Sequence, residues 1–222
     1  MNQEQARFNM VEQQIRTWKV LDPQVLDLLF IVKREGFVPA ALRKLAFADV
    51  DIPLGHGASM FPPKIEAHAL QALQLKPHAT VLEIGAGSGY MAALLAAHAD
   101  HVWTVEIVPE LAEMARANLA RHGVTNVSVD TGDGLAADGA WRAHGPFDAI
   151  MVSGALPMVM VPPELLAALK PGGRLFAIVG EAPLMTAQVV TRVGEGGFRT
   201  ENLFETQAMP MVNAPTPSRF TF

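Results

Sequence analysis

The sequence predicts a doubly wound α/β fold with a mostly parallel sheet, because strand and helix patterns alternate from residue 78 onward. Short apolar strands are expected at 80–84, 101–105, 127–129, 147–152 and 174–179, with helices at 90–98, 110–121 and 163–169. A glycine-rich turn lies between the first strand and the first helix, and a tight turn at 170–173 precedes the fifth strand. Two later apolar runs, 187–193 and 203–209, have no long helix between them and predict antiparallel strands at one sheet edge.

Residues 1–77 are expected to form a helical elaboration on the core of residues 78–222, within one integrated domain. Phe8, Val11 and Ile15 recur at helical spacing, and Asp22 followed by proline predicts the start of a second helix. Short helical patterns follow at 39–45 and 63–75, separated by an extended, turn-rich stretch at 51–57.

Composition excludes several classes of protein. The chain has 222 residues, no cysteine and a net charge of −5, so disulfides and thiolate chemistry are excluded and a broad nucleic-acid-binding face is disfavoured. The polar N-terminus lacks the apolar core of a signal peptide, and no apolar run reaches the roughly 18 residues that cross a bilayer. We therefore expect a soluble cytoplasmic protein without a membrane partner, whose oligomeric state the sequence leaves open.

The glycine-rich turn carries the main functional signal. Gly85, Gly87 and Gly89 follow an apolar strand and open a helix, which allows a sharp turn and a close approach to a ligand. NAD-binding folds use the spacing G-x-G-x-x-G, whereas here the third glycine comes one residue earlier, so NAD is the weaker alternative. With Glu83 two positions before the first glycine, the E-x-G-x-G-x-G pattern resembles that of class I methyltransferases.

This resemblance implies S-adenosylmethionine as the cofactor and S-adenosylhomocysteine as the product. Glu106 ends the second strand, where its carboxylate can accept hydrogen bonds from both ribose hydroxyls. Asp133 follows the third strand and is placed to accept an adenine amino hydrogen. The expected cofactor-binding residues are Glu83, Gly85, Ala86, Gly87, Ser88, Gly89, Glu106, Ile107, Asp133 and Gly134.

Two stretches before the core narrow the family. The segment 34–39 reads R-E-G-F-V-P, and 51–63 reads D-I-P-L-G-H-G-A-S-M-F-P-P. They resemble the R-E-x-F-V-P and P-[IL]-G-x-G-Q-T-I-S-x-P motifs of protein-L-isoaspartate O-methyltransferases, and the likeness covers residues 8–180. It implies a Rossmann-like methyltransferase fold and a carboxyl methyltransferase acting on L-isoaspartyl residues of damaged proteins, for repair. The implied substrate loop contains Gly55, His56, Gly57, Ala58, Met60 and Pro63.

The chain departs from this family at one functional position, because the family's active-site serine falls on Phe61. A phenyl ring makes no conventional side-chain hydrogen bond. Ser59, two residues earlier, is the candidate replacement, and a local capping role is the alternative for this serine. Phe61 also keeps two other functions open: methyl transfer to a different acceptor, and a cofactor-binding module without isoaspartyl activity.

Other chemistries find less support. The seven histidines lack the H-E-x-x-H spacing of a zinc helix, and Ser88 lacks the flanking glycines of a nucleophile elbow, so no metal site and no hydrolase are expected. The stretch 154–157, with Met158 and Met160 beyond it, either walls the substrate site or simply connects two elements. An extended C-terminal tail is expected at 212–220, with Phe220 and Phe222 as possible docking groups.

Overall fold

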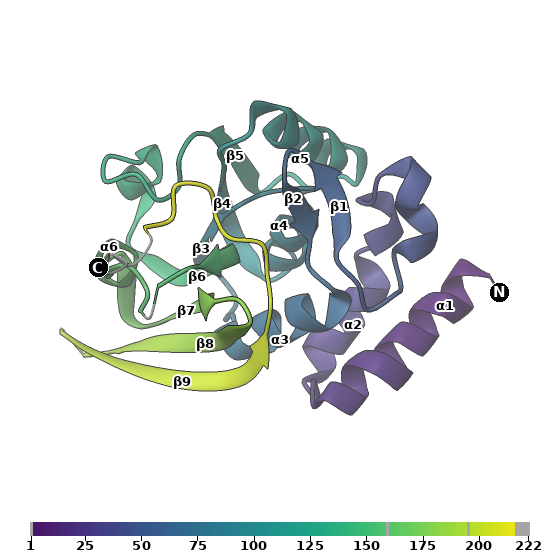
Figure 1. Cartoon of the computed structure of the whole chain (residues 1–222), viewed down its shortest axis with the longest axis horizontal. Helices are drawn as coiled ribbons and strands as arrows, with labels where there is room; N and C mark the ends of the chain where they lie inside the picture. The colour runs from purple at the N-terminus through teal and green to yellow at the C-terminus, as the bar shows by residue number, and fades with distance from the viewer. Residues whose placement is uncertain (1, 159, 195, 216–222) are drawn as a thin grey trace, which may run out of the picture.

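The computed structural model describes residues 2–158, 160–194 and 196–215, and in it one twisted sheet organises the chain (Figure 1). Its strand order is β5-β4-β3-β6-β7-β8-β9, with parallel pairing from β5 to β7 and antiparallel pairing at the β7–β8 and β8–β9 ladders. The predicted parallel sheet with an antiparallel edge is therefore confirmed. The strands are β3 Ala79–Ile84, β4 Ala99–Glu106, β5 Val127–Thr131, β6 Phe147–Leu156, β7 Leu169–Glu181, β8 Leu184–Val193 and β9 Gly197–Thr206.

Both faces of the central strands are buried, as parallel sheets require. Successive side chains of β3 point to opposite faces, so Val81 belongs to one hydrophobic cluster and Leu82 to the other. The first cluster also holds apolar residues of three helices, α3 Pro63–Leu73, α4 Tyr90–Ala96 and α5 Pro109–Arg121. The second cluster receives Leu165 from α6, Pro163–Ala167, and Trp141 from the 3₁₀ turn Ala140–His144.

The N-terminal segment packs against the first of these clusters. It consists of α1 Gln3–Asn9, a π-helical turn Met10–Ile15, α2 Pro23–Ile31 and three 3₁₀ turns, Arg16–Trp18, Arg34–Gly36 and Ala40–Leu45. The Asp22 side chain accepts a hydrogen bond from Gln24 N, which confirms the predicted cap. Met10 shares its cluster with Val81, while the boundary near residue 77 stays a prediction.

The predicted apolar face of the first helix is wrong at Phe8, which is 49% exposed, whereas Arg7 is buried. The physical reason is the π-helical turn that begins at Met10, because its wider repeat changes which side chains face the core. Val11 and Ile15 lie in that turn and are buried as expected.

The extended stretch after these helices forms a hairpin of β1, Ile52–Gly55, and β2, Ala58–Met60. Its two-residue loop has positive φ at both positions, 53° at His56 and 75° at Gly57, which is the geometry of a type I′ turn. The turn pairs Gly55 with Ala58, and a register shift between Gly55 and Pro53 then places Pro53 opposite Ser59. The hairpin lies over the carboxyl end of the sheet, beside α4 in the view of Figure 1.

The last predicted strand is misplaced, because β9 spans Gly197–Thr206 rather than 203–209. Most β9 side chains are exposed, so the strand lacks the apolar alternation on which the prediction depended. The predicted turn at 170–173 lies within β7, where the β6–β7 pairing jumps from Phe147↔Leu169 to Ala149↔Arg174. Gly172, with φ of 81°, allows this local turn.

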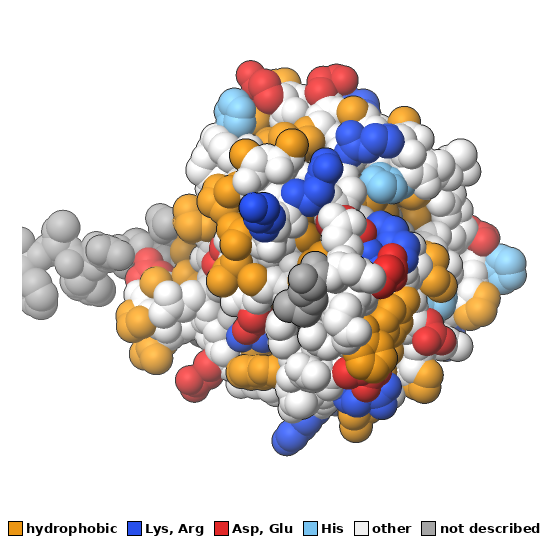
Figure 2. All heavy atoms as spheres, turned by 90° about the vertical axis from the view of Figure 1, so that its right-hand side faces the viewer, with side chains coloured by type: hydrophobic (Ala, Val, Ile, Leu, Met, Phe, Trp, Pro, Cys, Tyr) orange, Lys and Arg blue, Asp and Glu red, His pale blue; other side chains and the backbone are white. Residues whose placement is uncertain are grey.

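The outer surface is mixed in character. On the face formed by the N-terminal segment, basic, acidic and hydrophobic side chains are interspersed (Figure 2). Within the described ranges, no helix is long and apolar enough to cross a bilayer. Of the predicted tail, residues 212–215 are described, whereas 216–222, including Phe220 and Phe222, lie outside the described residues.

Candidate active site

A pocket opens at the carboxyl ends of β3 and β6, where the strand order reverses. From β3 the chain continues to β4 and β5 on one side, and β6 and β7 lie on the other. Such a switch point is where open α/β sheets bind ligands, because the loops leaving adjacent strands diverge there. The pocket holds about 830 Å³ of space that is continuous with solvent, and residues of the glycine-rich turn, the β1–β2 hairpin and the C-terminal region line it.

The glycine-rich turn forms one wall of the pocket. Gly85, Gly87 and Gly89 have φ angles of 94°, 51° and 82°, so all three adopt the left-handed conformation that glycine permits without strain. Gly85, Ala86, Gly87 and Ser88 line the pocket, as predicted. A Cβ at Gly87 would lie 3.1 Å from Leu54 Cδ1 of the hairpin, so this glycine also allows the two walls to approach each other.

Glu106 holds the turn in place from the end of β4. Its Oε2 accepts a hydrogen bond from Gly87 N at 2.8 Å, and its Oε1 accepts one from Val108 N at 3.0 Å. The residue is 5% exposed, and both Glu106 and the neighbouring Ile107 line the pocket. A carboxylate fixed in this way has lone pairs left for two hydroxyl donors.

Glu83 lies below the turn and is fully buried. Its Oε2 accepts a hydrogen bond from Thr104 Oγ1 at 2.7 Å, and its Oε1 accepts one from Ser153 Oγ at 2.9 Å. Burial raises the pKa of Glu83 to about 8, the nearby Glu106 carboxylate adds to the rise, and the two hydroxyl hydrogen bonds oppose it. The protonated form therefore predominates at neutral pH.

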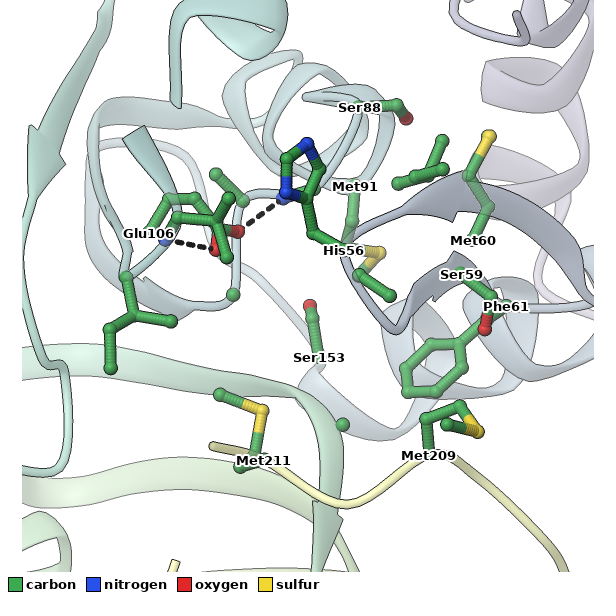
Figure 3. Close-up of a pocket in the computed structure, with 18 of the residues that line it drawn as sticks. His56, Ser59, Met60, Phe61, Ser88, Met91, Glu106, Ser153, Met209 and Met211 are labelled. Carbon is green, nitrogen blue, oxygen red and sulfur yellow. Dashed lines mark hydrogen bonds between the residues drawn. The ribbon is translucent and has the colours of Figure 1, made fainter. Parts of the chain in front are cut away.

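The β1–β2 hairpin and the residues after it form the opposite wall. His56, Gly57, Ala58, Ser59, Met60 and Phe61 all line the pocket. The Ser59 side chain is half-buried and, within the described residues, makes no hydrogen bond, so the structure gives no support to a local capping role. Figure 3 shows Ser59 beside Phe61, whose ring points toward Met209. Phe61 is 7% exposed and presents an apolar ring, which makes no conventional side-chain hydrogen bond, to the pocket.

An ion pair buried beneath this wall fixes its position. Arg34 and Glu66 form a salt bridge with side chains 1% and 4% exposed. The Arg34 Nη2 atom also donates to the Phe61 carbonyl oxygen at 2.6 Å, and its guanidinium lies 5.0 Å from the centre of the Tyr90 ring. Burial raises the pKa of Glu66 to about 7, and the Arg34 charge limits the rise. Arg34, the first residue of the R-E-G-F-V-P stretch, therefore holds the loop in place from beneath the pocket wall.

A C-terminal strap, residues 208–213, runs from β9 over the sheet (Figure 1), and the sequence interpretation missed its place at the pocket. Ala155 N donates to Met209 O at 2.8 Å, and Met211 N donates to Ala155 O at 2.8 Å, which holds the strap against β6. A Cβ at Gly154 would lie 2.4 Å from Met211 Sδ, so the absence of a side chain there makes room for the strap. Met209, Pro210, Met211 and Val212 consequently line the pocket.

Five predicted site residues lie outside the pocket lining: Gly55, Pro63, Gly89, Asp133 and Gly134. Gly89 packs against α5, since a Cβ there would lie 3.2 Å from Ala115 backbone atoms. Gly134 packs in the same way against Ile84. The Asp133 carboxylate accepts hydrogen bonds from Leu135 N at 2.9 Å and from Asn213 Nδ2 at 3.0 Å. The strap therefore shares the carboxylate that was expected to bind adenine.

Several pocket residues gave no clear signal in the sequence: Leu54, Glu66, Tyr90, Met91, Val108 and Ser153. Only the place of Ser153, between the predicted strand 147–152 and Gly154, could have pointed to it, because ligands bind at the carboxyl ends of such strands. Met158 and Met160 lie outside the lining, and Met160 is 74% exposed, because β6 continues to Leu156 and carries them past the pocket. The pocket methionines are instead Met60, Met91, Met209 and Met211.

The sequence is similar to those of known methyltransferases along most of the chain. The chain is 42% identical over 207 residues to a protein-L-isoaspartate O-methyltransferase of Rhodopseudomonas palustris, covering 92% of each chain. It is 42% identical over 200 residues to the enzyme of that name from Myxococcus xanthus, covering 88% of this chain and 92% of the relative.

Solved structures show the same fold. A chain from Plasmodium falciparum, assigned as a protein-L-isoaspartate O-methyltransferase and solved with S-adenosyl-L-homocysteine, superposes with a TM-score of 0.80 and 20% identity. The superposition covers 95% of this chain and 98% of the other. The fold is therefore the Rossmann-like fold of methyltransferases. The family model for protein-L-isoaspartate(D-aspartate) O-methyltransferase matches residues 5–215, so the chain belongs to that family.

Proposed function

We propose that this chain transfers a methyl group from S-adenosylmethionine to the side-chain carboxylate of L-isoaspartyl residues in damaged proteins. The observation that carries the proposal is a single pocket that joins the glycine-rich turn and Glu106 to the loop containing Ser59. The names of relatives 42% identical to the chain support this acceptor. A cytoplasmic location of the protein remains a prediction from the sequence.

The residues on the donor side fit S-adenosylmethionine, which supplies an activated methyl group on a positively charged sulfur. Glu106 presents carboxylate oxygens for ribose hydroxyls, and Ile107 and Val108 offer an apolar surface for a base. The left-handed glycines Gly85 and Gly87 leave the space that side chains would fill. Within our proposal, Asp133 contributes to the donor site through the hydrogen bond that it accepts from Asn213 of the strap.

The acceptor side needs to position a carboxylate rather than to deprotonate it. An isoaspartyl carboxylate is ionised at neutral pH, so its oxygen can form the new O–C bond as the C–S bond breaks, without a general base. Ser59 has a hydroxyl without a partner among the described residues and can donate it to the substrate. Phe61, Met60 and the strap line the acceptor side with apolar side chains, which favour exclusion of water once the substrate is bound.

The test uses the wild-type protein, radiolabelled donor and two peptides that differ only in an isoaspartyl or a normal aspartyl linkage. We expect base-labile label on the isoaspartyl peptide only. Calorimetric binding of S-adenosylhomocysteine without transfer would favour a binding module, and label on neither peptide but on another acceptor would contradict the proposed substrate.

The Phe61→Ser substitution tests how the absence of the family's serine affects methyl transfer. The loop backbone is held by Arg34 through the Phe61 carbonyl, so a serine there can keep the same backbone path and add a donor. We expect kcat/KM for the isoaspartyl peptide to rise about tenfold, the size of one hydrogen bond to a charged group. Phe61→Ala is the matched control, because it opens the same space without adding a donor, and equal gains in both variants would show that the ring acts only by bulk.

A further inference from the structure

We propose that Ser153 is a second acceptor-binding residue, whose hydroxyl holds the substrate carboxylate from the sheet side of the pocket while the Ser59 loop holds it from the other. This inference rests on the proposed function, because it assigns a partner to the same carboxylate. The argument depends on where Ser153 lies, on what fixes its hydroxyl and on what faces it.

Ser153 occupies the position in β6 that meets the switch point. The β3–β6 ladder pairs Ile84 with Val152, and β3 ends there, whereas β6 continues to Ser153. The β6–β7 pairing is irregular between Met151 and Ala155, and such irregularities often re-aim a side chain next to an active site. A Cβ at Gly85 would lie 3.5 Å from Ser153 Cβ, so the missing side chain of that glycine leaves room beside Ser153.

The hydroxyl is held by a buried anchor and faces the pocket. Ser153 Oγ lies 2.9 Å from Glu83 Oε1 and donates to it when that carboxyl group is ionised, and Thr104 fixes the other oxygen of the same group. The Ser153 side chain is half-buried and lines the pocket. In Figure 3 its hydroxyl points into the space between His56, Met91 and Phe61. A hydroxyl with a fixed partner behind it costs less entropy when it binds a ligand in front.

The protonation state of Glu83 determines whether the Ser153 hydroxyl can donate a hydrogen bond to a substrate carboxylate. Burial raises the pKa of Glu83 to about 8, Glu106 on β4 and Glu66 on α3 raise it further, and hydrogen bonds from Thr104 and Ser153 lower it. Arg34 forms an ion pair with Glu66, and His56 at the hairpin tip lines the same pocket. A protonated Glu83 can donate its hydrogen to Ser153 Oγ, which frees the Ser153 hydrogen to point toward a substrate carboxylate.

Ser59 and Ser153 bind the substrate carboxylate from opposite walls of the pocket. A carboxylate has two oxygens with about four lone-pair directions, and the oxygen that attacks must keep one of them free. In Figure 3 Ser153 and Ser59 come from different elements, β6 and β2, and both border the space next to Phe61. Holding a carboxylate from two sides restricts its rotation, which is what in-line transfer requires.

The experiment measures donor and acceptor binding separately. Calorimetry first gives the affinity of Ser153→Ala for S-adenosylhomocysteine, and then the affinity of that complex for the isoaspartyl peptide. We expect unchanged donor affinity and about tenfold weaker peptide binding, with KM raised by a similar factor. Ser128→Ala is the matched control, because Ser128 is a β5 serine that contacts His101 and does not line the pocket.

Two results would overturn the assignment of Ser153. Peptide binding equal to wild type would show that the hydroxyl is only a partner of Glu83, and a loss of S-adenosylhomocysteine affinity would place Ser153 on the donor. A wild-type protein that neither binds nor methylates the isoaspartyl peptide would overturn the proposed function itself. Equal urea midpoints for the Ser153→Ala and Ser128→Ala variants establish that the comparison is made between folded proteins.

Discussion

The two sides of the pocket are built in different ways. On the donor side, one stretch from β3 through the glycine-rich turn supplies most of the wall, and Glu106 fixes it by accepting a hydrogen bond from Gly87 N. On the acceptor side, the wall combines the β1–β2 hairpin, the C-terminal strap and the buried Arg34, which are far apart in the sequence. The donor side is therefore determined locally, whereas the acceptor side depends on long-range packing.

This difference predicts how each side responds to substitution. A local wall loses ligand affinity when its key carboxylate is removed, but its fold is kept by the strand and helix that flank it. A wall assembled from distant segments loses stability as well, because the same contacts hold the segments together. Substitutions of Arg34, Glu106 and Glu83 test that contrast, with the largest effect expected at Arg34.

Arg34→Ala should cause the largest loss of stability. Removing the guanidinium leaves Glu66 buried without its cation and leaves the Phe61 carbonyl without its donor. Breaking a buried pair from one side costs about 3–5 kcal/mol, so we expect a decrease of that size in the free energy of unfolding, measured in urea. The double variant Arg34→Ala/Glu66→Leu should recover much of it, because no unpaired charge remains.

Arg16→Ala is the control for this prediction. Arg16 forms an ion pair with Glu12 at 2.9 Å, but its side chain is 49% exposed, so the loss should stay below about 1 kcal/mol. Similar losses for Arg16→Ala and Arg34→Ala would contradict the idea that the buried pair holds the acceptor wall in place.

Glu106→Ala should act on affinity rather than on the fold. The substitution removes the acceptor for Gly87 N and Val108 N and, in our proposal, for the ribose hydroxyls. We expect S-adenosylhomocysteine to bind about 100-fold more weakly, or about 2.7 kcal/mol, by calorimetry. Glu110→Ala, an exposed residue in the first turn of α5, should bind normally. A Glu106→Ala protein that unfolds before it loses affinity would show that the donor side also depends on packing.

The same contrast explains what the sequence could predict. The parallel sheet, the glycine-rich turn and Glu106 follow from apolar periodicity and fixed spacing, which are local properties. The strap could not be predicted in this way, because Met209 and Met211 reach the pocket only through hydrogen bonds to Ala155, about 55 residues earlier in the chain. Phe8 was misplaced for a similar reason, since a π-helical turn changes the phase of the helix without a clear sequence signal.

Glu83 lies where the two sides meet and should give a smaller effect, one that depends on pH. Burial raises the pKa of Glu83 from 4.5 to about 8, so between these values the folded chain holds a proton that the unfolded chain has lost. The unfolded state then binds fewer protons, and stability falls as pH rises, by at most about 1.4 kcal/mol per pH unit for one group. Below pH 4.5 both states are protonated and Glu83 has no effect.

Between pH 7 and pH 8 Glu83 contributes the larger share of the decline, because Glu66, whose pKa is raised to about 7, contributes with the same sign but mostly at lower pH. Glu83→Gln should therefore flatten the decline in urea stability between pH 7 and pH 8, since an amide can still accept from Thr104 and donate to Ser153. The matched Glu113→Gln, on an exposed side chain of α5, should leave the decline unchanged. A wild-type stability that rises across this window would mean that Glu83 is ionised in the folded protein, and Ser153 would then have no free hydrogen for a substrate.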